Sequence, residues 1–473
     1  MNNKFKSLLC FILALVFCCC LMPTSFSAID EPEISHSTAS LIYCNEPDKV
    51  LWSENAELSV YPAALTKLMT VVVAAEGISE GKFKEDQYIT ASSSAIKATM
   101  GNSISIAVGE KLKLKDLIGA TILAGANDAA LIIAETLGGS VDGFVSLMNE
   151  KAKELGMKNT VYTNPTGLHN DKMVTTAEDL LILAKHASRI QFLTELFSTT
   201  RLVIDATNKS ETRYLGTRNF LQSNRVSTDY YYPGANGMIC GSTSEAGFCI
   251  IATAQHDGLN YIAIVLGAGS TTVITRPEYE IVDEEGNTTV VPAEYKTIIH
   301  SFVEAATLLK WAKDNYEYIK AIDSSTPICQ IPVRLAESVD NVVLLPETPV
   351  ELYVPVDINK KKDIEISWEL ESEYLTAPVS AGEKVGTVTV KYEGEIIGQV
   401  GLVVKTNIQQ SGALVLLNRV EQLASSPFFL VIIIAISLGA IIYIFATAVS
   451  RSRKKAAARL EFIKKNRYIG NGK

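Results

Sequence analysis

The chain has 473 residues, 47% of them hydrophobic, and a formal net charge of −9 at pH 7. Residues 451–473 carry nine Lys or Arg and one Glu, a net of +8, and the first six residues add two lysines. Subtracting +8 and +2 from −9 leaves −19 for the rest of the chain. Such an acidic surface repels phosphate backbones, so nucleic acid is excluded as a partner.

The N-terminus has the three parts of a secretory signal peptide. A short basic start, "MNNKFK", precedes an apolar run from Leu8 to Leu21, and small residues surround Ser25 and Ser27. This order predicts a signal peptide over residues 1–27. An uncleaved membrane anchor is the alternative interpretation.

Helical and strand patterns alternate across a first predicted domain, residues 36–323. Alternation of this kind predicts α+β packing around an antiparallel sheet. The expected elements, in chain order, are a hairpin over 38–57, two helices over 114–139 that break near "AGAND", a helix over 141–156, a helix over 175–189 capped by Thr175 or Thr176, and two strands over 246–269.

The chain changes character after this domain. A stretch over 276–296 predicts an extra hairpin with "EEGN" at its tip, and residues 299–320 predict a helix. Short alternating strands then predict a small all-β domain over 324–407. Residues 408–427 are expected to form a linker or a short helix.

The run "FFLVIIIAISLGAIIYIFATAV" (428–449) has no charged residue and is long enough to cross a bilayer core of ~30 Å. A buried core helix of this length would carry polar residues on one face, so a transmembrane helix is expected. The basic tail, 450–473, follows directly. Positive charge beside a span stays in the cytoplasm, which predicts a large extracellular part and a cytoplasmic tail.

Four cysteines remain after the predicted signal peptide: Cys44, Cys240, Cys249 and Cys329. Their spacing fits neither a disulfide framework nor a zinc site, so free and mostly buried thiols are expected, with one bridge still compatible with the sequence. We predict no metal and no cofactor.

Long stretches of the chain resemble D-alanyl-D-alanine carboxypeptidases, the low-molecular-weight penicillin-binding proteins of serine peptidase family S11. The resemblance covers residues 38–405 and rests on "YPAALTKLMT", "VGEKLKLKDLIGATILAGANDAALIIAE", "MNEKAKELGMKNTVYTNPTGLHNDKMVTTAEDL" and "NGMICGSTSEAGFCIIATA". It implies a penicillin-binding/β-lactamase-like α+β domain, a small all-β domain, membrane attachment and action on the peptidoglycan of a bacterial cell wall.

The family's first motif, S-x-x-K, places a serine nucleophile and a lysine on one helix face. Here it reads Ala64-Leu65-Thr66-Lys67, so the lysine is retained and the attacking hydroxyl is absent. The second motif, S-x-N, reads Gly125-Ala126-Asn127: the asparagine is retained and the serine is lost.

The third motif, K-T-G, binds the terminal carboxylate of the substrate in the family. Here it reads Ile239-Cys240-Gly241, so the positive charge and the threonine hydroxyl are both gone. Together the three motifs predict a membrane-anchored pseudoenzyme that binds peptidoglycan or a cell-wall or division protein. Lys67 is then expected to be structural, pairing with Asn127 or with an acid; the alternative is that it is a relic without a role.

Two other functions remain open. Carboxypeptidase activity could persist through a substitute nucleophile, with Cys240 as the candidate because it borders the expected cleft and Lys67 could supply a base. The protein could instead be a structural or signalling membrane protein whose basic tail touches anionic lipid. His169, in "TGLHND", is interpreted as a structural turn residue.

Overall fold

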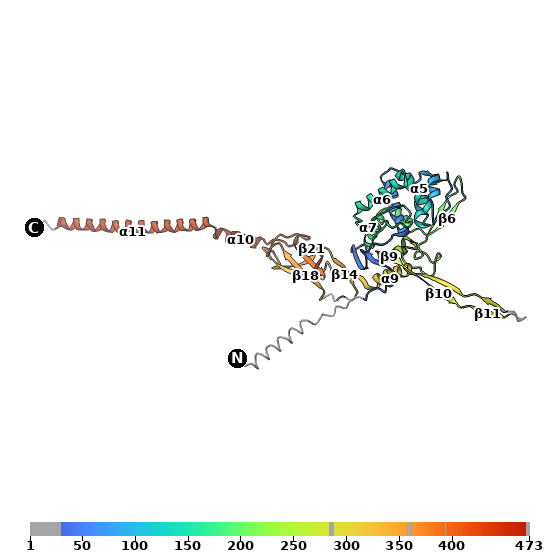
Figure 1. Cartoon of the computed structure of the whole chain (residues 1–473). Coiled ribbons are helices and arrows are strands. Elements are labelled where there is room, and N and C mark those ends of the chain that lie inside the picture. The colour runs from blue at the N-terminus through green and yellow to red at the C-terminus, as the bar shows by residue number, and fades with distance from the viewer. Residues whose placement is uncertain (1–29, 283–287, 357, 359–361, 393, 470–473) are drawn as a thin grey trace, which may run out of the picture. The chain divides into compact units, whose positions relative to one another are not determined.

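The protein is described from a computed structural model covering residues 30–282, 288–356, 358, 362–392 and 394–469 (Figure 1). The predicted signal peptide and the "EEGN" tip lie outside these residues. The chain divides into two compact units, one of residues 1–317 with 353–357 and one of 318–352 with 358–473. The domain bounds 36–323 and 324–407 remain proposals.

The first unit is built on a five-stranded antiparallel sheet in the order β2-β1-β9-β8-β7. The expected hairpin is confirmed as β1 and β2, and the two late strands as β8 and β9. The sheet strands are β1 (Ala39–Cys44), β2 (Lys49–Glu54), β7 (Ala235–Thr243), β8 (Gly247–His256) and β9 (Leu259–Ala268).

Helices cover both faces of this sheet. Because side chains alternate along a strand, Ile262 and Ile264 of β9 face the helices on one side while Ala263 and Val265 face α9 (His300–Asn315) on the other. The helices on the first side are α2 (Thr66–Ser79), α4 (Leu114–Leu123), α5 (Asn127–Gly138), α6 (Val141–Leu155), α7 (Ala177–Ala187) and α8 (Gln191–Phe197).

The predicted helix boundaries follow local chemistry. Thr176 is the cap of α7, because its hydroxyl accepts a hydrogen bond from the Asp179 N–H at 3.1 Å. The break near "AGAND" separates α4 from α5, and Gly125 sits in it with φ +66°. The short elements around these helices are η1 (Ala63–Leu65), β3 (Tyr88–Thr90), α3 (Ser93–Ala98), β4 (Lys111–Lys113), β5 (Arg201–Ile204) and β6 (Arg213–Gly216).

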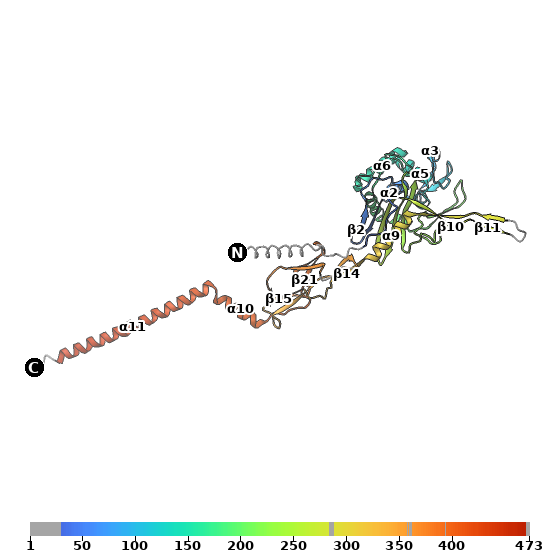
Figure 2. The same cartoon turned by 60° about the horizontal axis from the view of Figure 1, so that its bottom comes forward.

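The extra hairpin forms and is longer than expected. It has two successive two-stranded ladders, labelled β10 and β11 in Figures 1 and 2. Their strands are β10 (Ser270–Arg276), β11 (Tyr279–Val282), β12 (Thr288–Val291) and β13 (Glu294–Ile299). The helix predicted over 299–320 is partly wrong, since α9 ends at Asn315 and β14 (Tyr316–Ile322) begins there. Tyr316, Tyr318 and Lys320 occupy every second position of this segment, and the two tyrosines favour an extended strand because aromatic residues are enriched in strands.

The second unit contains a six-stranded sheet in the order β18-β20-β21-β16-β15-β19, which confirms the all-β region. Alternate residues Val388 and Val390 of β20 are fully buried and Val385 nearly so. The strands of this region are β15 (Cys329–Arg334), β16 (Asn341–Pro346), β17 (Val350–Pro355), β18 (Ile364–Leu370), β19 (Leu375–Thr376), β20 (Lys384–Tyr392) and β21 (Glu395–Val403).

Two helices end the chain. The expected linker or short helix is the helix α10 (Gly412–Ala424), and α11 runs over Pro427–Ile469. Among the described residues, α11 is the single unbroken helix that is long and apolar enough to cross a membrane, and its apolar side chains have no protein to pack against.

Candidate active-site cleft

The first motif forms a turn of 3-10 helix that leads into α2. Ala64 lies in η1, half-buried, and Lys67 lies in the first turn of α2 with 2% of its surface exposed. Ala63, the residue before Ala64, has φ +47°, a left-handed conformation that costs a non-glycine residue roughly 1–3 kcal/mol. Backbone strain of this kind is common at functional sites, and here it lies next to Ala64, the position that has no nucleophile.

Lys67 is held by a backbone carbonyl. Its Nζ donates to the backbone oxygen of Thr166 at 2.6 Å, and among the described residues neither Asn127 nor an acid pairs with it. Burial, with a smaller contribution from the positive charge of Arg218, lowers the Lys67 pKa to about 7. Lys67 thus has the pKa of a general base at neutral pH, but position 64 of its motif offers no hydroxyl for it to deprotonate.

The loop that carries Thr166 also approaches η1 closely. Asn164 Oδ1 accepts hydrogen bonds from the Thr166 N–H, the Thr166 hydroxyl and the Gly167 N–H, at 2.8–3.0 Å. Gly167 has φ +78°, and a Cβ there would lie 1.9 Å from the carbonyl oxygen of Ala63. Sequence reasoning missed this loop as part of the site, although "NPTG" is a visible turn signal.

The second motif lies at the start of α5. Gly125 has a left-handed backbone, and a Cβ there would lie 3.4 Å from Arg218 Cδ and 3.4 Å from Asn102 Nδ2. Asn127 donates from Nδ2 to the Met100 carbonyl at 2.6 Å, while its buried Oδ1 has no hydrogen-bond partner among the described residues. One polar atom of the retained asparagine is therefore free to accept a hydrogen bond.

The third motif lies on β7, at the edge of the sheet. Gly241 packs directly on η1, since a Cβ there would lie 2.4 Å from the Ala64 Cβ. Ile239 is 3% exposed and belongs to the hydrophobic core, so the structure does not bring it into the cleft with the other motif residues. A lysine at 239 would thus have to enter an apolar environment.

Cys240 is half-buried and lines the cleft. Its Sγ donates to the Arg218 carbonyl at 3.2 Å, and burial raises the pKa of the thiol to about 12 despite the charge of Arg218. A thiol with this pKa is protonated at neutral pH and a poor nucleophile.

Arg218 is a second cleft residue that the sequence analysis missed. Its side chain is exposed, lines the cleft beside Gly125, and donates from Nη1 to Asn102 Oδ1 at 3.3 Å. It follows β6 in "GTRNF", and no motif spacing marked it. A cation therefore remains in the cleft although the K-T-G lysine is absent.

These residues line one cleft of about 150 Å³. Pockets for drug-sized ligands have volumes of roughly 300–1,000 Å³, so this cleft is small. Its lining contains the Arg218 guanidinium and one unpartnered amide oxygen, Asn127 Oδ1, which can bind an anionic group and a hydrogen-bond donor. Its members from the motifs are Ala64, Lys67, Gly125, Asn127, Cys240 and Gly241.

Two further residues near the cleft have structural partners. Thr66 donates from its buried hydroxyl to Met173 Sδ at 3.4 Å, whereas Lys67 Nζ donates to the Thr166 carbonyl. His169 Nε2 lies 3.1 Å from an Asp171 oxygen, and its ring packs edge-on against Tyr61.

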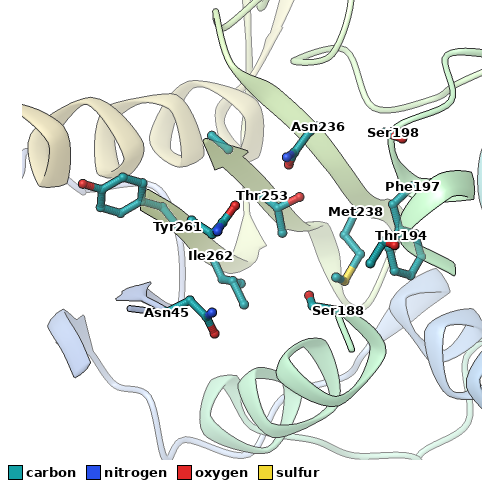
Figure 3. A pocket seen from close by; sticks show the side chains of 12 residues that line it. Asn45, Ser188, Thr194, Phe197, Ser198, Asn236, Met238, Thr253, Tyr261 and Ile262 are labelled. Atoms are coloured by element: carbon teal, nitrogen blue, oxygen red, sulfur yellow. The ribbon is translucent and has the colours of Figure 1, made fainter. Parts of the chain in front are cut away.

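A second cavity, of about 260 Å³, lies between the sheet and the region of α7 and α8 (Figure 3). Figure 3 shows neutral polar side chains from the strands, such as Asn236 and Thr253, beside the apolar Met238 and Phe197. None of the motif residues lines it. Its lining includes hydroxyls of serine and threonine but no charged or basic side chain that could activate one of them.

Two family profiles match the sequence. Residues 26–270 match the D-alanyl-D-alanine carboxypeptidase family of S11 peptidases, and residues 316–410 match the C-terminal domain of penicillin-binding protein 5. The first match covers just over half of the chain, and the two matches leave residues 271–315 uncovered.

Similar proteins extend over most of the chain. The D-alanyl-D-alanine carboxypeptidase DacF of Bacillus subtilis is 27% identical over 425 residues, covering 89% of this chain and 98% of its own. DacA of Escherichia coli is 26% identical over 385 residues, covering 80% and 85%. The crystal structure of penicillin-binding protein 5 from Haemophilus influenzae aligns with a TM-score of 0.55 at 23% identity, covering 81% of this chain and all of that one. That structure supports the fold.

Proposed function

The chain belongs to the D-alanyl-D-alanine carboxypeptidase family, and from this premise we propose that it is a membrane-anchored, non-catalytic member that binds peptidoglycan. The observation that carries the proposal is Ala64 at the nucleophile position, packed against Gly241, beside a Lys67 with no hydroxyl to activate. A methyl group cannot form an acyl-enzyme.

Retained activity through Cys240 is the alternative. Its protonated, hydrogen-bonded thiol argues against it, since thiolate formation would need a cation or base strong enough to offset burial. Lys67 cannot take this role easily while its Nζ is bound to the Thr166 carbonyl.

Arg218 and Asn127 support binding of a stem peptide by its terminal carboxylate and amide. The exposed guanidinium can pair with a carboxylate, and Asn127 Oδ1 can accept from a peptide N–H. A charge-assisted hydrogen bond contributes roughly 1.5–3 kcal/mol, and competition from water at an exposed arginine lowers that figure. We therefore expect weak, reversible binding.

Catalysis is tested with a fluorescent penicillin and with a peptide ending in D-Ala-D-Ala. Purified full-length protein in detergent should form no covalent adduct by intact-mass spectrometry and release no D-alanine. Active B. subtilis DacF serves as the positive control. An adduct at Cys240, or any turnover above the buffer blank, would establish the alternative.

Binding is tested by sedimentation with purified wall sacculi. Arg218→Gln should reduce the bound fraction, whereas Arg225→Gln should not, because Arg225 is an exposed arginine that does not line the cleft. Equal binding by both variants would show that the cleft does not hold the wall.

A further inference from the structure

The extra hairpin of the first unit forms an arm, defined here as residues 270–282 with 288–299. Both views show β10 and β11 extending away from the rest of that unit (Figures 1 and 2). The family matches stop at residue 270 and resume at 316, so the arm is an addition to what the matched profiles share. The residues that line the cleft lie within the matched range, so the cleft does not account for the arm.

The arm exposes large apolar side chains. Ile274 and Tyr295 pair across β10 and β13 and are 61% and 66% exposed, and Tyr279, Ile281 and Val290 are exposed farther along. A two-stranded ribbon alone is marginally stable in water. An exposed ribbon with this composition gains stability when another strand or surface covers it.

One edge of the arm is already occupied at its base. The Tyr230 hydroxyl accepts from the Ile299 N–H at 2.8 Å and donates to the Thr297 carbonyl at 3.3 Å. Lys296, the residue before Thr297, forms an ion pair with Asp229 at 2.7 Å. The outer edge of β13 is thus covered and charged.

The other edge is open. Among the described residues β10 has β13 as its only strand neighbour. Thr297 and Ile299 direct backbone groups away from β10, toward Tyr230. In an antiparallel ladder, the residues opposite them, Thr272 and Ser270, therefore direct their own N–H and C=O groups away from β13. The backbone groups of Ile274 point the same way, because it follows Thr272 by two residues. Residues 270–275 contain no charge and no proline, the two features that usually protect an edge from strand addition.

The charge left over on the arm is negative. Arg276 and Lys296 are each neutralised by an ion pair of 2.7 Å. Glu278 and Glu280 are exposed and form no ion pair with another described residue, and the sequence places three further acids at 283–285. A partner strand therefore gains by being basic, whereas a second copy of this acidic chain would bring like charge.

We propose that β10 is a docking edge where an extended, basic segment of another protein adds a third strand to the arm. Main-chain hydrogen bonds to Thr272 and Ile274 hold the segment. Ile274 contacts its β-branched or apolar residues, and Glu278 and Glu280 select Lys or Arg. This site is separate from the cleft and does not depend on the proposed peptidoglycan binding.

Random peptides of about 12 residues are displayed on phage and selected for binding to the full-length protein in detergent. Phage that also bind the Ile274→Pro variant are removed. Proline at 274 removes an outward N–H and leaves the β10–β13 ladder bonds, which belong to Val273 and Thr271. The matched control is Tyr295→Pro, which removes an outward N–H from the opposite edge. Enriched sequences should be net basic and free of proline.

One enriched peptide is then synthesised and its affinity measured by fluorescence anisotropy. Ile274→Pro and the charge variant Ile274→Lys should each weaken binding about tenfold or more, Tyr295→Pro less than about twofold. Ile274→Lys keeps the backbone intact, so it decides the matter if proline unfolds the arm. Three results would each overturn the proposal. They are equal affinity of the peptide for Ile274→Lys and wild type, failure to enrich any peptide, and a dimer in sedimentation that Ile274→Lys dissociates.

Discussion

At the scale of single residues, the cleft keeps two motif side chains that have structural partners, Lys67 and Asn127, and has no hydroxyl at positions 64 and 125. Lys67 stabilises the loop through Thr166, and Asn127 holds the Met100 carbonyl. Ala64 and Gly125 have no side-chain function to retain. A side chain that also holds the fold is lost less readily than one that only acts on substrate.

Restoring the nucleophile alone should restore little activity. Ala64→Ser supplies an oxygen next to Lys67, but Gly125 still lacks its hydroxyl and Ile239 still lacks a positive charge. Missing proton transfer costs roughly 10²–10⁴ in rate. We expect labelling by fluorescent penicillin at least about 100-fold slower than for DacF. Labelling within tenfold of DacF would mean that the serine is the only functional loss.

The buried lysine should also make stability depend on pH. Since its pKa in the folded protein, about 7, is below its usual 10.5, the unfolded chain binds more protons between these values. Stability of the wild type should therefore rise with pH across this window, by up to about 1.4 kcal/mol per pH unit.

The measurement compares melting temperatures of wild type and Lys67→Met at pH 6.5 and pH 9, in the same detergent. Methionine does not titrate, so the difference, wild type minus variant, should become more positive at pH 9. A constant difference would show that the Lys67 pKa is close to its ordinary value.

At the scale of elements, the site depends on the contact between η1 and the turn at Gly167. Gly167→Ala should destabilise the first unit by about 3 kcal/mol, because the new Cβ meets the Ala63 carbonyl in addition to the left-handed strain of about 1 kcal/mol. Gly81→Ala is the matched control, with φ +74° and no atom within 4 Å of the new Cβ.

Thermal denaturation distinguishes these effects. Gly81→Ala should lower the melting temperature slightly and Gly167→Ala several times more. Similar shifts for both would mean that η1 and the 164–168 loop move apart at little cost.

At the scale of the whole molecule, attachment should depend on α11. We expect the full-length protein to stay in the membrane fraction after carbonate extraction and a chain truncated after Ser426 to be released. The remaining α10 exposes Leu416, Leu417 and Leu423, an apolar face suited to the membrane surface rather than to spanning. Retention of the truncated chain after carbonate would show that the anchor lies elsewhere.

The basic residues that follow the span, 451–459, predict a cytoplasmic C-terminus. Labelling of intact cells with a membrane-impermeant maleimide checks this. A cysteine introduced by Ser452→Cys should react only after permeabilisation. One introduced by Ser93→Cys, at an exposed position of the unit that this orientation places outside the cell, is the control for accessibility. Labelling of Ser452→Cys in intact cells would reverse the assigned orientation.

The sequence by itself determined the family, the helix order and the lost motif residues, and it narrowed the α7 cap to Thr175 or Thr176. Motif spacing, caps and hydrophobic periodicity are local properties. Only the tertiary structure decided that Arg218 and Thr166 complete the cleft while Ile239 leaves it. Those placements depend on how a loop and an edge strand pack against η1, from segments about 100 residues or more away in the chain. The end of α9 at Asn315 was likewise missed, since helix and strand preferences compete at Tyr316 and neighbouring strands decide between them.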